Sequence, residues 1–444
     1  MFETFRRQFK NKNVVKGKKV TERQYILYRK WKAFGNRICF YLCRIFPIKK
    51  NLVSVCTFEG KGGFGCNPKY LVQELHRRNP DYKFVWFVND MNKEFPDYIT
   101  KVPNTLWSRA YWLSVSRVWI DNYRKPYGTC KRKEQYYLNV NHYTIGIKCT
   151  GLWRGQGFSE MAYLVSKNDS DMIDDLVIDS DWCEEVSPKG LVYDGTYQRT
   201  GAPRCDILYG NRTEQKQMFR RKHHLPEDAK VVMFAPTFRE GAKDGKRSVY
   251  SEAWSIDFKR LIDNLERKFG GTWYLCVRVH PQLAPSFKEY KNPDIQDRII
   301  DESQADDMYE ILAGMDAYIS DYSSACFEAG FAHIPVFLYA DDIQKYVCDR
   351  GALMWNLAVD PKDCIGNNKV MTPNFDVKLP FTLASDNEEL EKNIMEFDRP
   401  QYDQRLDEFH EKVGLVFDGR ASKNLADLII RICECYEKDE FGRI

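Results

Sequence analysis

The side chains best suited to chemistry stand directly after short apolar segments of this 444-residue chain. In the segment DAYISDYSSACFE, an apolar run leads into Asp321, Ser323 and Ser324 at the expected start of a helix. Hydroxyls and backbone N–H groups at a helix N-terminus bind anions. We therefore predict an anion site at this position. The alternative is that Ser323 or Ser324 only caps the helix.

Two other segments of the same half end in a similar way. The apolar run WYLCV continues into Arg278 and His280, and the run VVMFAP is followed by Thr237 and Arg239. An imidazole at such a position donates to a phosphate oxygen or moves a proton near neutral pH. The carboxyl ends of parallel strands converge. Four side chains are therefore predicted to surround one pocket: Thr237, Arg239, His280 and Ser323. A structural role for His280 is the alternative.

The first half contributes a further histidine. His142 follows the run YYLNVN and precedes Gly146, which permits close backbone approach, and Lys148, which supplies charge. Between the halves, the turn GAPRCD carries Arg204, which is suited to bidentate phosphate contact. The alternatives are a structural His142 and a linker salt bridge between Arg204 and Asp206.

Length and pattern predict the elements that position these residues. A chain of this size divides naturally into two domains, and apolar runs alternate with helical patterns as in parallel α/β sheets. The break falls at Thr200–Asp206, and the chain after Pro380 is mostly helical, with helices expected at Glu388–Phe397 and Tyr402–Lys438. The expected strands are Leu52–Phe58, Lys83–Val88, Arg117–Ile120, Tyr136–Val140, Leu176–Ile178, Val231–Ala235, Trp273–Val279, Ala317–Ser320 and Val336–Tyr339.

The N-terminal segment is strongly basic. Residues 1–50 hold fifteen Lys or Arg against two Glu, a balance of +13, so the remaining chain is −9 within the total of +4. Aromatic and aliphatic residues alternate with basic ones over Arg23–Ile48, which favours an amphipathic helix on anionic lipid. The longest stretch without a charged residue in this segment is too short to span a bilayer. A helix packed on the body and a nucleic-acid patch are the alternatives. The acidic remainder argues against nucleic acid.

Several chemistries are disfavoured by missing motifs. The sequence has no GxGxxG after the first strand, no Walker A sequence, no GxSxG, no HExxH and no CxxC pair. The fourteen cysteines are scattered without metal-ligand spacing, which predicts reduced thiols. No metal site is expected.

The ordered set of motifs from about Ile45 to Ile430 resembles the CDP-glycerol glycerophosphotransferases, the teichoic-acid and capsule polymerases and primases of bacteria. The motifs that carry the resemblance are, in order, FPIKK with Asn67-Pro68, SVSRVWIDN, the His142 segment ending in GIK, GAPRCD, APTFRE, RVHP, ISDYSSACFE, PVFLY with Tyr346 and Arg350-Gly351, and DGRAS.

This resemblance implies a GT-B-like α/β fold, in which two Rossmann-type domains face each other across a cleft. The expected reaction transfers glycerol phosphate, or ribitol phosphate in relatives, from a CDP-activated donor to a hydroxyl of a lipid-linked or polysaccharide acceptor and releases CMP. No cofactor is expected. The family is membrane-associated without spanning, which implies a peripheral protein on the cytoplasmic face of the bacterial membrane. The domains expected are residues 1–50 (membrane-associating), 51–200 (acceptor side), 201–400 (CDP donor) and 401–444 (C-terminal helices).

The resemblance also assigns residues. His142 is expected to take the acceptor proton, and His280 to act on the donor phosphates as the second catalytic residue. The donor- and phosphate-binding set is Arg204, Asp206, Thr237, Arg239, Arg278, Asp321, Ser323, Ser324 and Glu328.

Three departures from the family pattern concern the acceptor and the polyol. The chain has Asn141-His142-Tyr143 where Trp-His-Gly is usual, Glu328 where Asp is common, and Cys66 where an acidic residue is frequent. Two other hypotheses stay open: a glycosyltransferase of the same fold that uses a nucleotide sugar, and a non-catalytic membrane-bound scaffold.

Overall fold

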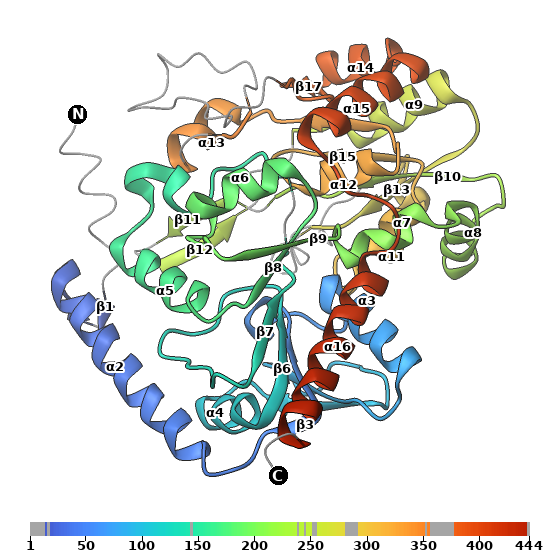
Figure 1. Ribbon diagram of the computed structural model, residues 1–444. Coiled ribbons are helices and arrows are strands. Elements are labelled where there is room, and N and C mark those ends of the chain that lie inside the picture. The colour runs from blue at the N-terminus through green and yellow to red at the C-terminus, as the bar shows by residue number, and fades with distance from the viewer. Residues whose placement is uncertain are drawn as a thin grey trace.

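The computed structural model describes residues 14–15, 18–142, 145–237, 239–243, 246–250, 255–279, 292–350, 353–355 and 377–441. Two parallel β-sheets form separate layers, each flanked by helices (Figure 1). Figure 1 places the first sheet low in the view and the second sheet above it.

The first sheet has seven parallel strands in the order β5-β4-β3-β6-β7-β8-β9. Their bounds are β3 Lys49–Cys56, β4 Lys83–Val88, β5 Ile99–Pro103, β6 Ser116–Asp121, β7 Tyr136–Asn139, β8 Asp175–Ile178 and β9 Thr196–Arg199. The central strands are continuous apolar or buried runs, because helices cover both faces of a parallel sheet. In β6, for example, all six residues are buried.

The second sheet repeats this topology with six parallel strands in the order β14-β13-β10-β15-β16-β17. Their bounds are β10 Lys230–Phe234, β13 Trp273–Val277, β14 Ile299–Asp301, β15 Ala317–Ser320, β16 Val336–Tyr339 and β17 Thr382–Ala384. In both sheets the first strand in sequence lies beside the fourth, which is the doubly wound order of Rossmann-type domains. The prediction of two such domains is confirmed.

Helices and short strands connect the sheets and cover them. The helices of the first half are α2 Glu22–Cys43, α3 Cys66–Arg78, α4 Leu106–Val115, α5 Glu160–Ser170 and α6 Asp181–Gly190. Those of the second half are α7 Asp206–Tyr209, α8 Arg212–Lys222, α9 Phe258–Phe269, α11 Met308–Ala313, α12 Ala325–Phe331, α13 Ile343–Arg350, α14 Asn387–Met395, α15 Arg399–Val413 and α16 Ala421–Phe441. The 3₁₀ turns are η2 Phe58–Gly60, η3 Gly151–Gly157, η4 Pro203–Cys205 and η5 Gln296–Arg298, and two antiparallel pairs are β1 Val14–Val15 with β2 Lys18–Lys19 and β11 Arg239–Lys243 with β12 Lys246–Tyr250.

The single helix expected over Tyr402–Lys438 is wrong. Gly414 adopts a left-handed conformation with φ 63° and ends α15, because a residue at this position without a Cβ closes the last turn at little steric cost. After a short connection, α16 begins at Ala421.

The last helix crosses back to the first domain. Helix α16 lies beside α3 (Figure 1), and its Leu425, Ala426 and Ile429 belong to the same buried cluster as Val53 and Leu71. The first domain is therefore completed by the C-terminus of the described chain. The domain boundaries at residues 50, 200 and 400 stay predictions.

Helix α2 lies along one side of the first domain (Figure 1). A capping box starts it, because the Thr21 hydroxyl accepts from Gln24 N and the Gln24 side chain accepts from Thr21 N. Cys39 and Phe40 pack with the core of the first domain. In the described part of the chain, no helix is both long and apolar enough to cross a membrane.

We predict that Leu425→Ala lowers the free energy of unfolding by about 2–5 kcal/mol, since it empties a fully buried position where α16 meets the first sheet. Urea unfolding measures this loss. The exposed neighbour Asn424 provides the control, because Asn424→Ala removes a side chain that faces solvent. Equal stability of the two variants would show that α16 does not support the first domain.

Candidate functional site

The strand order of each sheet predicts where a ligand would bind. Ligands of open α/β sheets bind beyond the carboxyl ends of the strands, where the strand order reverses. In the first sheet this point lies between β3 and β6, and Asn122 follows β6 directly. In the second sheet it lies between β10 and β15, which lead to Thr237 and Asp321.

His142 lies at the first of these points. Its Nδ1 is 2.8 Å from the carbonyl oxygen of Asn122. A carbonyl only accepts, so Nδ1 carries the proton of the neutral ring and the lone pair is on Nε2. The rings of Phe58 and Tyr123 lie 5.6 and 5.2 Å from the imidazole. Burial, assisted by the charges of Arg204 and Lys148, lowers the pKa of His142 to about 4. The imidazole is therefore neutral at physiological pH.

The backbone before His142 is held by asparagines. Asn141 has a positive φ of 50°, which Asn tolerates better than most residues, and its side chain accepts from His142 N at 2.8 Å. Asn139 accepts from Asn141 N at 2.8 Å. Asn67, at the start of α3, donates to the carbonyls of Val140 and Asn141 at 2.7 and 3.0 Å. The position of His142 therefore depends on the Asn67 motif.

Arg204 connects this segment to the second domain. Its side chain is buried and forms an ion pair with Glu328 of α12, in which Nε donates to Oε1 at 3.0 Å. Another guanidinium nitrogen donates to the His142 carbonyl at 2.7 Å. Tyr309 donates to the second oxygen of Glu328, and its ring lies 4.8 Å from the Arg204 guanidinium. Burial lowers the pKa of Arg204, but the negative charge of Glu328 outweighs it and raises that pKa well above its ordinary value.

Asp206 binds the start of α16 and does not pair with Arg204. Its two carboxylate oxygens accept from the backbone N–H groups of Ala421 and Ser422 at 3.0 and 2.8 Å. A carboxylate at this position stabilises the first turn of α16. The alternative of an Arg204–Asp206 salt bridge is wrong, because Arg204 pairs with Glu328 and Asp206 caps a helix.

Thr237 and Asp321 join the two central strands of the second sheet. The backbone N–H and the hydroxyl of Thr237 both donate to Asp321 Oδ1 at 2.9 Å. Ser320 donates to the carbonyl of Ala235 at 2.7 Å. Asp321 is buried, so this carboxylate fixes the strand ends at the point where the sheet order reverses.

Residues from both domains line a cavity of about 480 Å³. His142 lines it from the first domain, and Ser323 and Ser324 line it from the second. The Ser323 hydroxyl accepts from Ala325 N at 3.4 Å, whereas Ser324, at the N-cap position, forms no side-chain capping bond. The predicted cleft between two domains, and with it the GT-B-like class, is confirmed.

Other lining residues were missed by the sequence reasoning. Arg124 and Arg154 add basic side chains, and Tyr346 stacks on Tyr322 with ring centroids 3.8 Å apart. Asp169 also lines the cavity, and burial raises its pKa to about 7. Asn122 and Arg124 follow β6, which ends at Asp121. Side chains that follow parallel strands converge at one edge of the sheet, so this criterion would have identified both residues.

The remaining predicted site residues lie elsewhere or are not described. Arg278 donates to the Ala305 carbonyl at 2.8 Å and is not among the residues that line the cavity. Burial lowers its pKa. The backbone of Arg239 begins β11, while its side chain and all of His280 and Tyr143 lie outside the described residues. The phosphate-binding and catalytic roles stay predictions.

Comparison with known proteins identifies the class to which this two-domain α/β protein belongs. Residues 38–431 match the model of the CDP-glycerol:poly(glycerophosphate) glycerophosphotransferase family, and the chain belongs to that family. It is 26% identical over 389 residues to the teichoic acid poly(glycerol phosphate) polymerase of Staphylococcus epidermidis, a match that covers 84% of this chain and 50% of that protein. For the polymerase of the same name from Bacillus subtilis the identity is 23% over 442 residues, covering 95% and 54%.

The chain therefore spans about half the length of these two curated relatives. Among solved structures, a histidine variant of the wall teichoic acid polymerase TagF superposes with a TM-score of 0.73 at 22% identity, covering 92% of this chain and 98% of that one. This likeness shows the shared fold.

We predict that Glu328→Gln costs about 3–5 kcal/mol of unfolding free energy, because it leaves the buried Arg204 charge without its counter-ion. Replacing both partners, as Arg204→Met with Glu328→Leu, is expected to cost less than Glu328→Gln alone. Denaturant unfolding of the three proteins measures the difference.

The exposed pair of Lys167 and Asp171 provides the matched control. Asp171→Asn is expected to change stability by less than about 1 kcal/mol. A Glu328→Gln protein as stable as this control would contradict the structural importance of the buried pair.

Proposed function

We propose that this protein transfers a polyol phosphate, most directly glycerol phosphate, from a CDP-activated donor to an acceptor hydroxyl and releases CMP. The observation that carries the proposal is a cavity in which a neutral His142 of one domain and Ser323 and Ser324 of the other are brought together, in a chain of this family. The curated relatives are named teichoic acid poly(glycerol phosphate) polymerases. The expected product is a teichoic-acid-like or capsular polymer.

The chemistry requires a base and an anion-binding surface. In the proposed step, Nε2 of His142 takes the proton of the acceptor hydroxyl, and the acceptor oxygen forms a bond to the β-phosphorus of the donor. The bond from that phosphorus to the oxygen bridging the two phosphates breaks, and CMP leaves with the bridging oxygen. No redox partner is needed.

Several residues fit the donor side of this step. The hydroxyls of Ser323 and Ser324 and the basic side chains of Lys148 and Arg154 line the cavity, where donors and positive charge stabilise phosphate oxygens in the transition state. Arg204 is buried against Glu328, so we assign it to positioning His142 through the carbonyl bond. His280 remains the candidate for a second catalytic contact with the phosphates.

We further propose that α2 holds the protein on the cytoplasmic face of the membrane, where a lipid-linked or polysaccharide acceptor is available. One face of α2 is buried, while large apolar side chains on the rest of the helix and just after it are exposed to solvent. They are Leu27, Tyr28, Trp31, Phe34, Ile38, Tyr41, Leu42, Ile45 and Phe46. Basic residues between them suit an anionic lipid surface.

The donor is tested by incubating the protein with CDP-glycerol, CDP-ribitol and a panel of nucleotide sugars, and by measuring the nucleotide released. CMP from a CDP-polyol is expected, and His142→Ala is expected to slow its release by about 10²–10⁴-fold, the usual contribution of a general base. Thermal unfolding checks that the variant is folded. His224→Asn, at an exposed histidine with φ 54°, is the matched control.

Two results would refute the proposal. Release of a nucleoside diphosphate from a nucleotide sugar, with no CMP from either CDP-polyol, would support the glycosyltransferase hypothesis. Unchanged CMP release by a folded His142→Ala protein would exclude His142 as the base.

The membrane proposal is tested with the combined variant Trp31→Ser, Phe34→Ser and Ile38→Ser, which alters exposed positions of α2 and leaves its buried face intact. Binding to vesicles containing an anionic lipid should weaken by more than about tenfold, because the apolar area available for insertion is lost. Sedimentation with the vesicles measures binding, and high salt should weaken it as well. Met218→Ser, exposed on α8, is the control. Undiminished vesicle binding by the triple variant would exclude this face of α2.

A further inference from the structure

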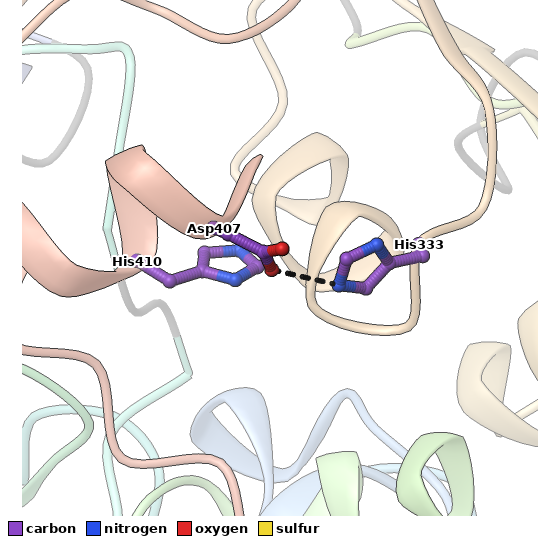
Figure 2. Close-up of side chains that lie close together, drawn as sticks. All are labelled: His333, Asp407 and His410. Atoms are coloured by element: carbon purple, nitrogen blue, oxygen red, sulfur yellow. Dashed lines mark ion pairs between the residues drawn. The ribbon is translucent and has the colours of Figure 1, made fainter. Parts of the chain in front are cut away.

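Three potential metal ligands meet on the second domain, away from the cavity. His333 follows α12 in the turn before β16, and Asp407 and His410 lie on α15 (Figure 2). One ligand atom of each lies within 4.8 Å of the others. Asp407 and His410 are three residues apart, so a helix presents both on one face.

His333 is oriented by its neighbours. Its Nδ1 lies 2.9 Å from a carboxylate oxygen of Asp403, while its Nε2 lies 3.5 Å from Asp407 Oδ1. A carboxylate accepts, so Nδ1 carries a proton and Nε2 is the atom turned toward the other two residues (Figure 2). Metal-bound histidines typically donate their second ring nitrogen to a carboxylate or carbonyl in this way.

The backbone of His333 is also constrained. It has a positive φ of 53°, which is uncommon for a residue other than Gly, and its carbonyl accepts from Arg399 at 2.7 Å. Arg399 lies 3.4 Å from Asp403 as well, so the charge of this carboxylate is partly balanced. The turn is thus held in the conformation that directs the imidazole toward α15.

The His410 side chain is partly buried and packs against aromatic rings. Its ring contacts the rings of Phe331 and Phe409, with centroids 5.6 and 6.2 Å away, and lies 6.0 Å from the His333 ring. These contacts fix the imidazole plane. Asp407 is mostly exposed, so its side chain is able to rotate toward a bound ion.

The separations suit a small tetrahedral ion. Zinc binds histidine nitrogen and carboxylate oxygen at about 2.0–2.2 Å, so ligand atoms around one tetrahedral zinc are about 3.3–3.6 Å apart. The His333–Asp407 distance of 3.5 Å already falls in this range. The remaining separations, up to 4.8 Å, require only small side-chain rotations.

We propose that His333, Asp407 and His410 form a zinc-type site of two imidazoles and one carboxylate, with a fourth position open to water. The bound ion links the end of α12 to α15. Helix α12 begins directly after Ser324 and carries Glu328, so the ion restrains the far end of the helix that supports the cavity. This role is structural and does not depend on the proposed transferase activity.

The site is tested by titrating Co²⁺ into the full-length chain, free of any histidine tag and stripped with a chelator. We expect one Co²⁺ per chain, seen as visible absorption of the ion in a low-symmetry site, and displacement of that absorption by Zn²⁺. Zinc should also raise the midpoint of thermal unfolding in a concentration-dependent manner, since it binds the folded state. The variants His333→Gln and Asp407→Asn should abolish saturable binding.

Two further variants sharpen the test. Asp403→Asn removes the carboxylate that orients His333 and leaves all three proposed ligands in place, and it is expected to weaken metal binding by about 10–100-fold. Glu408→Gln changes the adjacent carboxylate of α15, which faces Gln404, and should leave binding unchanged. Absence of stoichiometric Co²⁺ binding in the unaltered protein would overturn the proposal, as would equal binding by the Asp407→Asn and Glu408→Gln proteins.

Discussion

The buried ion pair between Arg204 and Glu328 is the interaction on which the site depends. A charged guanidinium removed from water is costly unless a counter-ion and further acceptors surround it. Glu328 supplies that counter-ion, and the His142 carbonyl takes another N–H of the same group. The segment that carries the candidate base is thereby fixed to α12, and the serines that precede α12 line the same cavity as His142. One desolvated pair thus sets the geometry of a cleft built from two domains.

Much of the architecture follows from buried apolar runs. All nine strands expected from the sequence are present, because strands covered on both faces are rich in consecutive apolar residues, a pattern that the sequence displays directly. The missed strands lie at or near sheet edges, and β9, with the sequence TYQR, has no buried residue. Such a strand lacks the pattern that identifies the others. The prediction of one helix over Tyr402–Lys438 overlooked Gly414, which adopts the left-handed conformation that ends α15.

The candidate site could be predicted only in part. The ends of parallel strands converge by topology, so His142, Ser323 and Ser324 could be expected in one cleft from the sequence and the family resemblance. The partners of the charged side chains could not be predicted from the sequence, because pairing depends on which side chains are buried together in the fold. The sequence did not indicate that Asp206 would bind the first turn of α16 or that Asp321 would bind Thr237. The cluster of His333, Asp407 and His410 could not be predicted from the sequence either, because His333 is far from the other two residues along the chain.

The return of α16 to the first domain also limits how the two domains can move. The chain crosses between the sheets twice, first around Gly201 and again between α15 and α16, and the crossings lie side by side. Gly201 packs against the Val416 carbonyl so closely that a Cβ there would lie 2.8 Å from the carbonyl oxygen. The Asp206 carboxylate accepts from two backbone N–H groups at the end of the second crossing. Two adjacent links of this kind restrict the movement of one domain against the other more than a single linker would.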